Sequence, residues 1–211
     1  MTPLVMLLAV LVLVSFAAGS IWNVRSGRVL MRWMQGGLPL LGERTTVRWL
    51  GTTAIEMVIR NAHSPFEQVT AVIFLEPRDV PWMWAISRGR GRRDTIIIRA
   101  RLRSAPTADI EMLDPRSWSG RDALRSIAAG QWTIRAPGPA GALPVYYKSP
   151  AVLERADELL ELARRSGLVV RRLSVRRTEP HLQIHVAPPA TVTPASEFFA
   201  AVRALGQRAS A

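Results

Sequence analysis

The chain has 211 residues, of which 48% are hydrophobic, and this length suits one core of ordinary size rather than several independent domains. Its 28 basic and 16 acidic residues give a formal net charge of +12, and Lys148 is the only lysine. Guanidinium groups favour anionic partners, namely lipid headgroups, nucleic acid or an acidic protein face, although a GC-rich genome also favours arginine codons. The absence of cysteine excludes disulfides, thiolate metal sites and cysteine nucleophiles.

The segment from Pro3 to Trp22 contains no charged residue and is rich in Leu, Val and Ala. As a helix, its roughly twenty residues would be about 30 Å long, the thickness of the hydrocarbon layer of a bilayer. Pro3 suits the first helical turn, and Trp22 suits the membrane interface. We therefore expect residues 1–22 to form a transmembrane anchor.

The small residues at 17–19 offer a cleavage site, so a secretory signal peptide is the alternative to an anchor. A signal peptide carries its basic residues before the apolar run, whereas here none precedes the run and Arg25, Arg28 and Arg32 follow it. The positive-inside rule places such a basic flank in the cytoplasm. The sequence therefore predicts an uncleaved, single-pass protein of the cell membrane whose soluble domain lies on the cytoplasmic side.

Residues 23–42 are expected to form a juxtamembrane amphipathic segment and a linker. Basic and apolar residues recur at three- and four-residue intervals, which is typical of a helix lying along a membrane surface. In this interpretation the interfacial residues are Trp22, Arg25, Arg28, Arg32 and Trp33. The alternative is a continuation of the first helix that packs its apolar stripe on the soluble domain. Glycines and Pro39 then end the helix, and the soluble domain is expected to span 43–211.

The soluble domain begins with residues of β-strand character. Segments 45–61 and 66–76 are rich in β-branched and aromatic residues, and Asn, His, Ser and Pro between them favour a turn. We expect these two segments to pair as strands.

Residues 95–103 alternate apolar side chains with arginines at 99, 101 and 103, the pattern of a strand with one buried face. We expect 109–113 to pair with this strand as a hairpin. That pairing would place Asp109 and Glu111 opposite the arginines, and each cross-strand ion pair would contribute up to about 1 kcal/mol.

A weakly patterned region follows, in which we expect a short helix over 121–129, a strand over 131–135 and a loop rich in Pro, Gly and Ala over 136–144. The next helix is well marked. Ser149 suits its N-cap, Pro150 its first position and Gly167 its end, and its leucines are spaced to face a core.

Two strands are expected over 168–176 and 181–187, joined by a turn. Pairing about this turn places Arg172 opposite His185 and Arg176 opposite His181, with the apolar residues together on the other face. Because no acid lies in this polar row, Arg172 and Arg176 are candidates for contact with an anion. A solvated sheet face without a partner is the alternative.

The chain is expected to end in a helix over 194–207 that directs two phenylalanines inward, followed by a frayed tail. Strands, a helix, two strands and a helix together predict an α+β domain. We expect a mostly antiparallel sheet that carries the two C-terminal helices on one face, preceded by the single transmembrane helix.

The sequence contains no recognisable catalytic or metal-binding motif. His181 and His185 have the spacing of a helical metal site, but on a strand they lie about 13 Å apart and cannot share one ion. No serine-hydrolase elbow, glycine-rich phosphate loop or zinc-protease motif occurs, and Asp79 suits a helix N-cap better than a catalytic acid. We therefore expect no enzymatic activity, no metal and no cofactor.

The stretch from Trp82 to Asp94 places apolar residues directly before a group of arginines. Trp82 and Ile86, four residues apart, are expected to pack into the core. We expect the arginines to face solvent and contact an anionic lipid or a protein partner; they are Arg88, Arg90, Arg92 and Arg93.

The sequence thus predicts a membrane-anchored accessory or scaffold protein whose basic cytoplasmic domain contacts anionic lipid, an acidic protein partner or a larger membrane complex. Tethering favours lipid, because each exposed arginine near an anionic membrane contributes about 1 kcal/mol. The alternatives are a membrane-tethered nucleic-acid-binding domain, which lacks an RNA-binding motif, and a secreted domain released by signal-peptide cleavage.

Overall fold

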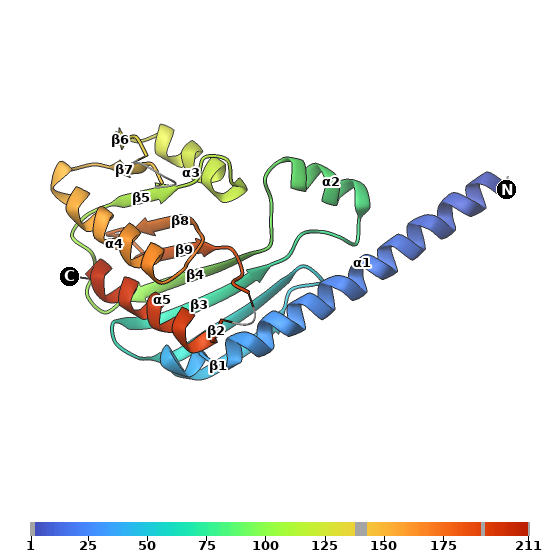
Figure 1. Ribbon diagram of the computed structural model, residues 1–211, viewed down its shortest axis with the longest axis horizontal. Helices are drawn as coiled ribbons and strands as arrows, with labels where there is room; N and C mark the ends of the chain where they lie inside the picture. Colours follow the sequence, from blue (N-terminus) through green and yellow to red (C-terminus); the bar gives the residue numbers. More distant parts are fainter. Residues whose placement is uncertain (1–2, 138–142, 191–192, 211) are drawn as a thin grey trace.

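The computed structural model describes residues 3–137, 143–190 and 193–210. A long helix, α1 (Pro3–Gln35), projects from an α+β body at its N-terminal half and packs on that body at its C-terminal half (Figure 1). From Leu4 to Phe16 the large apolar side chains of α1 are exposed. Among the described residues, α1 is the one helix long and apolar enough to cross a membrane, and a signal sequence meets the same criteria.

One antiparallel sheet, with nine strands in the described residues, forms the centre of the body, in the order β1-β2-β3-β4-β9-β8-β5-β7-β6. The expected mostly antiparallel sheet is confirmed. The strands are β1 (Gly42–Trp49), β2 (Ala54–Ala62), β3 (Phe66–Phe74), β4 (Thr95–Leu102), β5 (Ile110–Leu113), β6 (Thr133–Arg135), β7 (Val145–Tyr147), β8 (Val170–Val175) and β9 (Leu182–Val186).

The two C-terminal helices cover one face of this sheet, as expected (Figure 1). They are α4 (Leu153–Arg165), which follows the 3-10 turn η2 (Pro150–Val152), and α5 (Ala195–Ser210). Alternate residues of β4 share one buried cluster with Leu159 of α4 and Phe199 of α5. This burial explains why apolar residues occupy every second position of the strand. The tail expected to fray is helical to Ser210, and Ala209 is fully buried.

The opposite face of the sheet is covered in part by α3 (Trp118–Ala128), where a second apolar cluster joins Leu113, Ala123, Ile127 and Tyr146. This helix begins three residues before the predicted position, because Ser117 acts as its N-cap and accepts a hydrogen bond from the Gly120 amide. Part of the predicted loop over 136–144 lies outside the described residues.

The expected pairing of segments 45–61 and 66–76 is confirmed for β2 and β3. The segment 45–61 is not one strand, however, but the hairpin of β1 and β2, whose turn uses Gly51 at a positive φ of 77°. The predicted hairpin of 95–103 with 109–113 does not form, because β4 pairs with β3 and β9 while β5 pairs with β7 and β8. Arg101 instead binds Glu67 and Glu179 at 2.8 and 3.0 Å.

The predicted pairing of β8 with β9 is confirmed residue by residue. Arg172 lies opposite His185 and Ser174 lies opposite Gln183, while the Arg176 amide donates to the His181 carbonyl. The turn chemistry and the alternation fixed this register because the two strands are adjacent in the sequence.

The C-terminal half of α1 belongs to the folded body. Its buried residues recur at three- and four-residue intervals and form one stripe, namely Gly19, Asn23, Gly27, Leu30 and Met34. The segment after the helix, including the turn η1 (Leu38–Leu40), is packed as well, since Leu38 and Leu41 join the core. The core therefore begins inside α1, upstream of the boundary predicted at residue 43.

Candidate membrane-facing site

Helix α2 (Pro81–Gly89) presents an apolar face that nothing in the described part of the chain covers. Trp82, Met83 and Ile86 are 58%, 49% and 54% exposed, and α2 has no buried residue. The expectation that Trp82 and Ile86 pack into the core is therefore wrong. Their four-residue spacing does place them on one face, but this face points away from the sheet.

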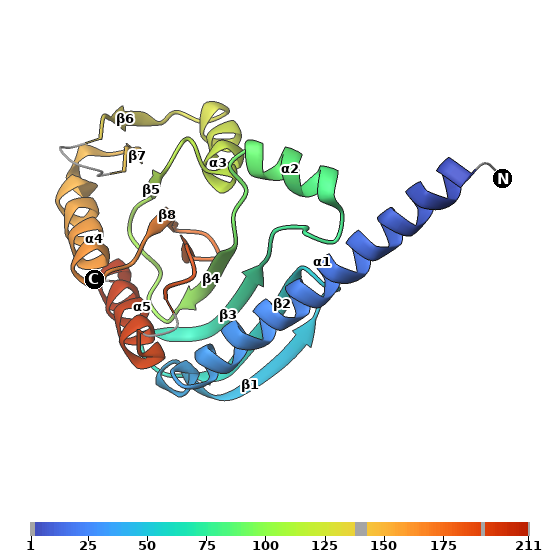
Figure 2. The ribbon, with the colours of Figure 1, turned by 45° about the vertical axis from the view of Figure 1, so that its right-hand side comes forward.

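This helix lies beside α1 at the level where α1 leaves the folded body. Figures 1 and 2 both show α2 as the element of the body that reaches farthest along α1 toward its N-terminus. The contact is tight, because a methyl group on Gly19 of α1 would overlap the carbonyl of Arg78 and the Cα of Asp79, just before α2. The exposed face of α2 therefore lies close to the exposed apolar surface of α1.

Polar contacts fix α2 on the body. Glu76, whose side chain is 3% exposed, accepts a hydrogen bond from Trp84 Nε1 at 2.5 Å and an ion pair from Arg88 Nη1 at 3.0 Å. Arg88 also lies over the Trp84 ring, 5.5 Å from its centroid. This arrangement turns Trp84 inward and leaves Trp82 and Met83 on the outside. Asp79, expected as the N-cap of this segment, instead accepts a hydrogen bond from Thr52, and Val80 occupies the cap position.

The arginines that follow α2 are less free than the sequence suggested. Arg88 pairs with Glu76, Arg92 lies 5.7 Å over the Trp118 ring, and Arg93 donates to the carbonyls of Arg88 and Arg92 at 2.7 Å. The expectation that all four arginines face solvent without acidic partners is wrong for Arg88. Arg90 is exposed, and no carboxylate in the described ranges pairs with it.

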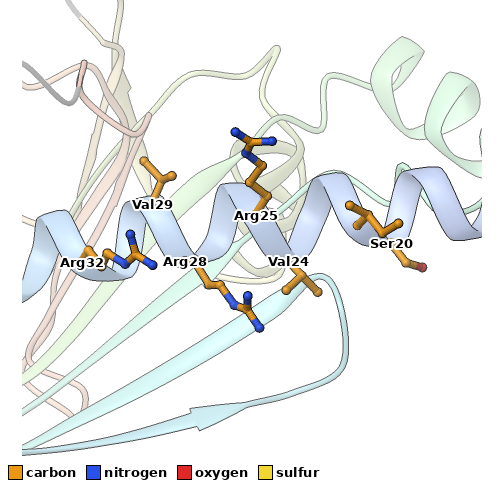
Figure 3. Close-up of a pocket in the computed structure, with 7 residues that line it drawn as sticks. Ser20, Val24, Arg25, Arg28, Val29 and Arg32 are labelled. Atoms are coloured by element: carbon orange, nitrogen blue, oxygen red, sulfur yellow. The ribbon is translucent and has the colours of Figure 1, made fainter.

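The arginines of α1 are exposed and lie on one side of the helix, at three- and four-residue intervals. In Figure 3 the side chains of Arg25 and Arg28 diverge from this side, and Arg32 lies one turn beyond Arg28. Trp22 is 64% exposed at the same level. Trp33, in contrast, packs on Phe198 and Phe199 of α5 and donates to the Thr193 carbonyl at 2.6 Å, so its contacts are with the folded body rather than with a membrane surface.

The second predicted anion-contacting pair, Arg172 and Arg176, binds a carboxylate within the chain. Fully buried Glu111 of β5 binds Arg172 and Arg176 and accepts a hydrogen bond from Ser174 at 2.8 Å. Arg176 also stacks on Trp132, 4.5 Å from the ring centroid. The expectation that no acid joins this polar row is wrong, because β5 pairs with β8 and brings Glu111 into the row.

The histidines do not meet at a metal site, and no group of three possible ligands occurs within the described ranges. His181 Nδ1 accepts a hydrogen bond from the Leu102 amide at 3.1 Å. His185 is buried. Desolvation, together with the charges of Arg172 and Arg99, lowers its pKa to about 3, so its ring is neutral at physiological pH.

Sequence reasoning missed the residues that dock α1 on the folded body. Gly19, Asn23 and Gly27 recur every fourth residue, and this small and polar stripe in a long helix is a signal of close packing against another part of the chain. Glu76 and Trp118 carried no comparable signal, because no spacing rule pairs Glu76 with Trp84 and Arg88, or Trp118 with Arg92. No protein-family model matches this chain, and no curated protein shows detectable sequence similarity to it.

Proposed function

We propose that this protein is a single-pass accessory or scaffold protein of the cell membrane, whose α+β body lies on the cytoplasmic side and rests α2 on anionic lipid. The observation that carries the proposal is the exposed face of α2, with Trp82, Met83 and Ile86, held against Gly19 where α1 leaves the body. When α1 spans a bilayer, this face lies at the level of the headgroups and the upper acyl chains.

The energetics favour lipid as the occupant of this face. About half of each of the three side chains is exposed, so burial in the interface contributes about 1 kcal/mol per residue. A total of about 3 kcal/mol is weak for a freely diffusing protein. It suffices for a body tethered by α1, because tethering makes the contact intramolecular.

The charge distribution supports both the anionic lipid and the sidedness. Arg25, Arg28 and Arg32 are exposed directly after the apolar part of α1, where the positive-inside rule favours the cytoplasm. Arg90 follows the apolar face of α2 and can reach the same surface. Each such arginine near an anionic leaflet contributes about 1 kcal/mol. An acidic protein partner would meet the same charges, but continuity with the apolar surface of α1 favours lipid.

The absence of cysteine permits a direct test with single labelling sites. An environment-sensitive fluorophore is placed on Ile86→Cys of the full chain, reconstituted in vesicles of phosphatidylcholine with or without phosphatidylglycerol. The matched control is Ser166→Cys, an exposed residue at the end of α4. We expect blue-shifted emission and quenching by lipid-borne quenchers at position 86, stronger with phosphatidylglycerol, and water-like emission at 166. Water-like emission at both positions would contradict the lipid contact.

The full chain is needed for this test, because a fragment starting at residue 43 would lose Leu30, Met34, Leu38 and Leu41 from the core. Salt-sensitive RNA binding, with the label at 86 remaining in water, would instead favour a nucleic-acid-binding domain.

The sidedness has its own test. A membrane-impermeant maleimide added to intact cells should leave Ser166→Cys unlabelled until the cells are permeabilised, and labelling of intact cells would contradict a cytoplasmic body. Mass spectrometry of the native N-terminus tests the anchor itself, since a mature chain starting near Ala18 would show that the apolar segment is a cleaved signal peptide.

A further inference from the structure

A small cavity lies on the face of the sheet opposite α4 and α5, between the loop after α2 and the start of α3. Its volume is about 40 Å³, which is room for about three water molecules or one small oxyanion. Ile97 of β4 and His185 of β9, which are neighbours across the two strands, both line it. Figures 1 and 2 show α3 next to the chain that connects α2 to β4.

The lining of this cavity is strongly basic. Arg92, Arg93 and Arg171 line it, and no carboxylate does. Arg171 is half-buried, and its hydrogen bond in the described structure is to Thr95 Oγ1 at 3.4 Å, with no ion pair. Burial and the charge of Arg93 lower the pKa of Arg171.

None of the nearby acids makes an ion pair with Arg171 in the described residues. Asp94 binds Arg78 at 2.8 Å and Glu76 binds Arg88 at 3.0 Å. Asp114, whose charge also acts on Arg171, accepts a hydrogen bond from the Arg116 amide at 2.9 Å. The cavity thus concentrates positive charge in a partly desolvated position, where it interacts strongly with an anion.

The N-terminus of α3 adds hydrogen-bond donors to the same cavity. Ser117 Oγ already accepts from the Gly120 amide at 2.9 Å, so the cap is complete at that position. Helix geometry leaves the amides of Trp118 and Ser119, in the first turn, without intrahelical acceptors. Both residues line the cavity, and the helix dipole there favours a negative charge.

A buried ring nitrogen without a partner lies in the same lining. His185 is 3% exposed, and its Nδ1 has no hydrogen-bond partner among the described residues. Its Nε2 lies 2.6 Å from Gln183 Nε2. When the amide nitrogen donates this bond, the neutral imidazole carries its proton on Nδ1. A buried N–H without an acceptor is rare, and it indicates a missing acceptor atom at this position.

We propose that this cavity binds a phosphate group, with Arg171 and Arg93 supplying charge and Ser119 and His185 supplying hydrogen bonds. The phosphate comes either from inorganic phosphate or from the headgroup of an anionic lipid. This site goes beyond the membrane contact proposed for α2, because its residues differ from the apolar face of that helix and binding of free phosphate does not require a membrane.

The first test is a titration of the full chain in neutral detergent with inorganic phosphate, against sodium chloride of equal ionic strength. We expect a saturable rise in Tm, reaching about 5–10 °C at a hundredfold excess over Kd. Arg171→Gln should lose this response. The matched control is Arg165→Gln on α4, whose side chain is 74% exposed, and it should keep the response. A rise that Arg171→Gln retains would be general salt stabilisation and would overturn the proposal.

A second variant covers the case in which Arg171→Gln fails to fold. Ser119→Asp places a carboxylate at the N-terminus of α3, so it should raise Tm without phosphate and abolish the further rise.

The two possible sources of the phosphate are distinguished by reconstituting the chain in nanodiscs without free phosphate. The nanodiscs contain phosphatidylcholine alone or phosphatidylcholine with phosphatidic acid. A rise in Tm with phosphatidic acid that Arg171→Gln abolishes assigns the site to a headgroup, whereas a rise with inorganic phosphate alone assigns it to the free anion. No Arg171-dependent rise with either source overturns the proposal. The fluorophore at position 86 reports the α2 contact independently, so failure of one proposal is distinguishable from failure of the other.

Discussion

Asn23 Oδ1 on α1 accepts a hydrogen bond from Arg78 Nη1 at 3.3 Å, although 55 positions separate the two residues. The same guanidinium binds both oxygens of Asp94, at 3.1 and 2.8 Å, and Asp94 accepts the Glu76 amide at 2.7 Å. One arginine therefore joins α1 to the segments that flank α2. The orientation of α2 relative to the apolar half of α1 is set by contacts inside the chain, before any membrane is present.

Replacement of this arginine should loosen α2. Arg78→Met keeps the aliphatic stem but leaves Asp94 partly buried without its cation, and we expect unfolding to become easier by about 1–3 kcal/mol. The change is measured by urea unfolding of the full chain in detergent, together with the rate of tryptic cleavage between Arg88 and Arg93. Arg48→Met is the control, since Arg48 is 68% exposed in its ion pair with Glu56 and should contribute less than about 1 kcal/mol. Equal losses in both variants would contradict a special role of Arg78.

Glu111 should be the costliest carboxylate to neutralise. Glu111→Gln removes the charge that two arginines share at a fully buried position, and we expect a loss of about 3–5 kcal/mol in unfolding free energy. Asp122→Asn is the control, because Asp122 pairs with Arg125 on the surface of α3 and should contribute less than about 1 kcal/mol. Thermal unfolding of the full chain measures both. A loss below 1 kcal/mol for Glu111→Gln would mean that Arg172 and Arg176 reach solvent without their partner.

The contrast between Glu111 and the β8–β9 hairpin shows what local pattern can predict. The register of Arg172 with His185 followed from alternation and a short turn, because both lie in one stretch of sequence. The neighbour on the other side of β8 is β5, about sixty positions earlier in the sequence. The alternation of apolar and polar residues in β5 predicts which face of the sheet Glu111 occupies, but it does not predict which strand lies beside β5. The two arginines assigned to an anionic surface therefore share one carboxylate on a strand that the pattern could not place.

The same limit applies to α2. Helical spacing correctly grouped Trp82 with Ile86 on one face, and the sequence assigned that face to the core because apolar faces are usually buried. The structure leaves this face uncovered, because Glu76 holds the opposite face, with Trp84 and Arg88, against the body. Helix propensity and apolar spacing determine which residues share a face, whereas the polar contacts of Glu76 determine where that face points.

Protonation of His185 should make the protein sensitive to mild acid. Its pKa is about 3 in the folded state against 6.5 for a free side chain, so the unfolded state binds the proton more readily. The neutral ring contributes fully to the free energy of unfolding above pH 6.5. This contribution is lost as the pH falls toward 3, at about 1.4 kcal/mol per pH unit within that window. Between pH 6.5 and 5 the chain should lose about 2 kcal/mol more than His185→Gln, measured by urea unfolding. Parallel pH profiles for the two proteins would contradict the assignment.

Gly19 should tolerate no side chain, because any Cβ there would overlap the backbone of Arg78 and Asp79. Alanine favours a helix over glycine by about 0.5–1 kcal/mol, so a net loss on Gly19→Ala means that the overlap outweighs this gain. We expect a net loss of about 1–3 kcal/mol, faster tryptic cleavage around α2 and a less blue-shifted label at position 86 in vesicles. Gly36→Ala is the matched control at the end of α1, where the nearest atom to the new methyl is at an ordinary 3.4 Å. Stability and label emission should there stay within error of the parent, and a Gly19→Ala protein that behaves like Gly36→Ala would show that α2 is not held by α1.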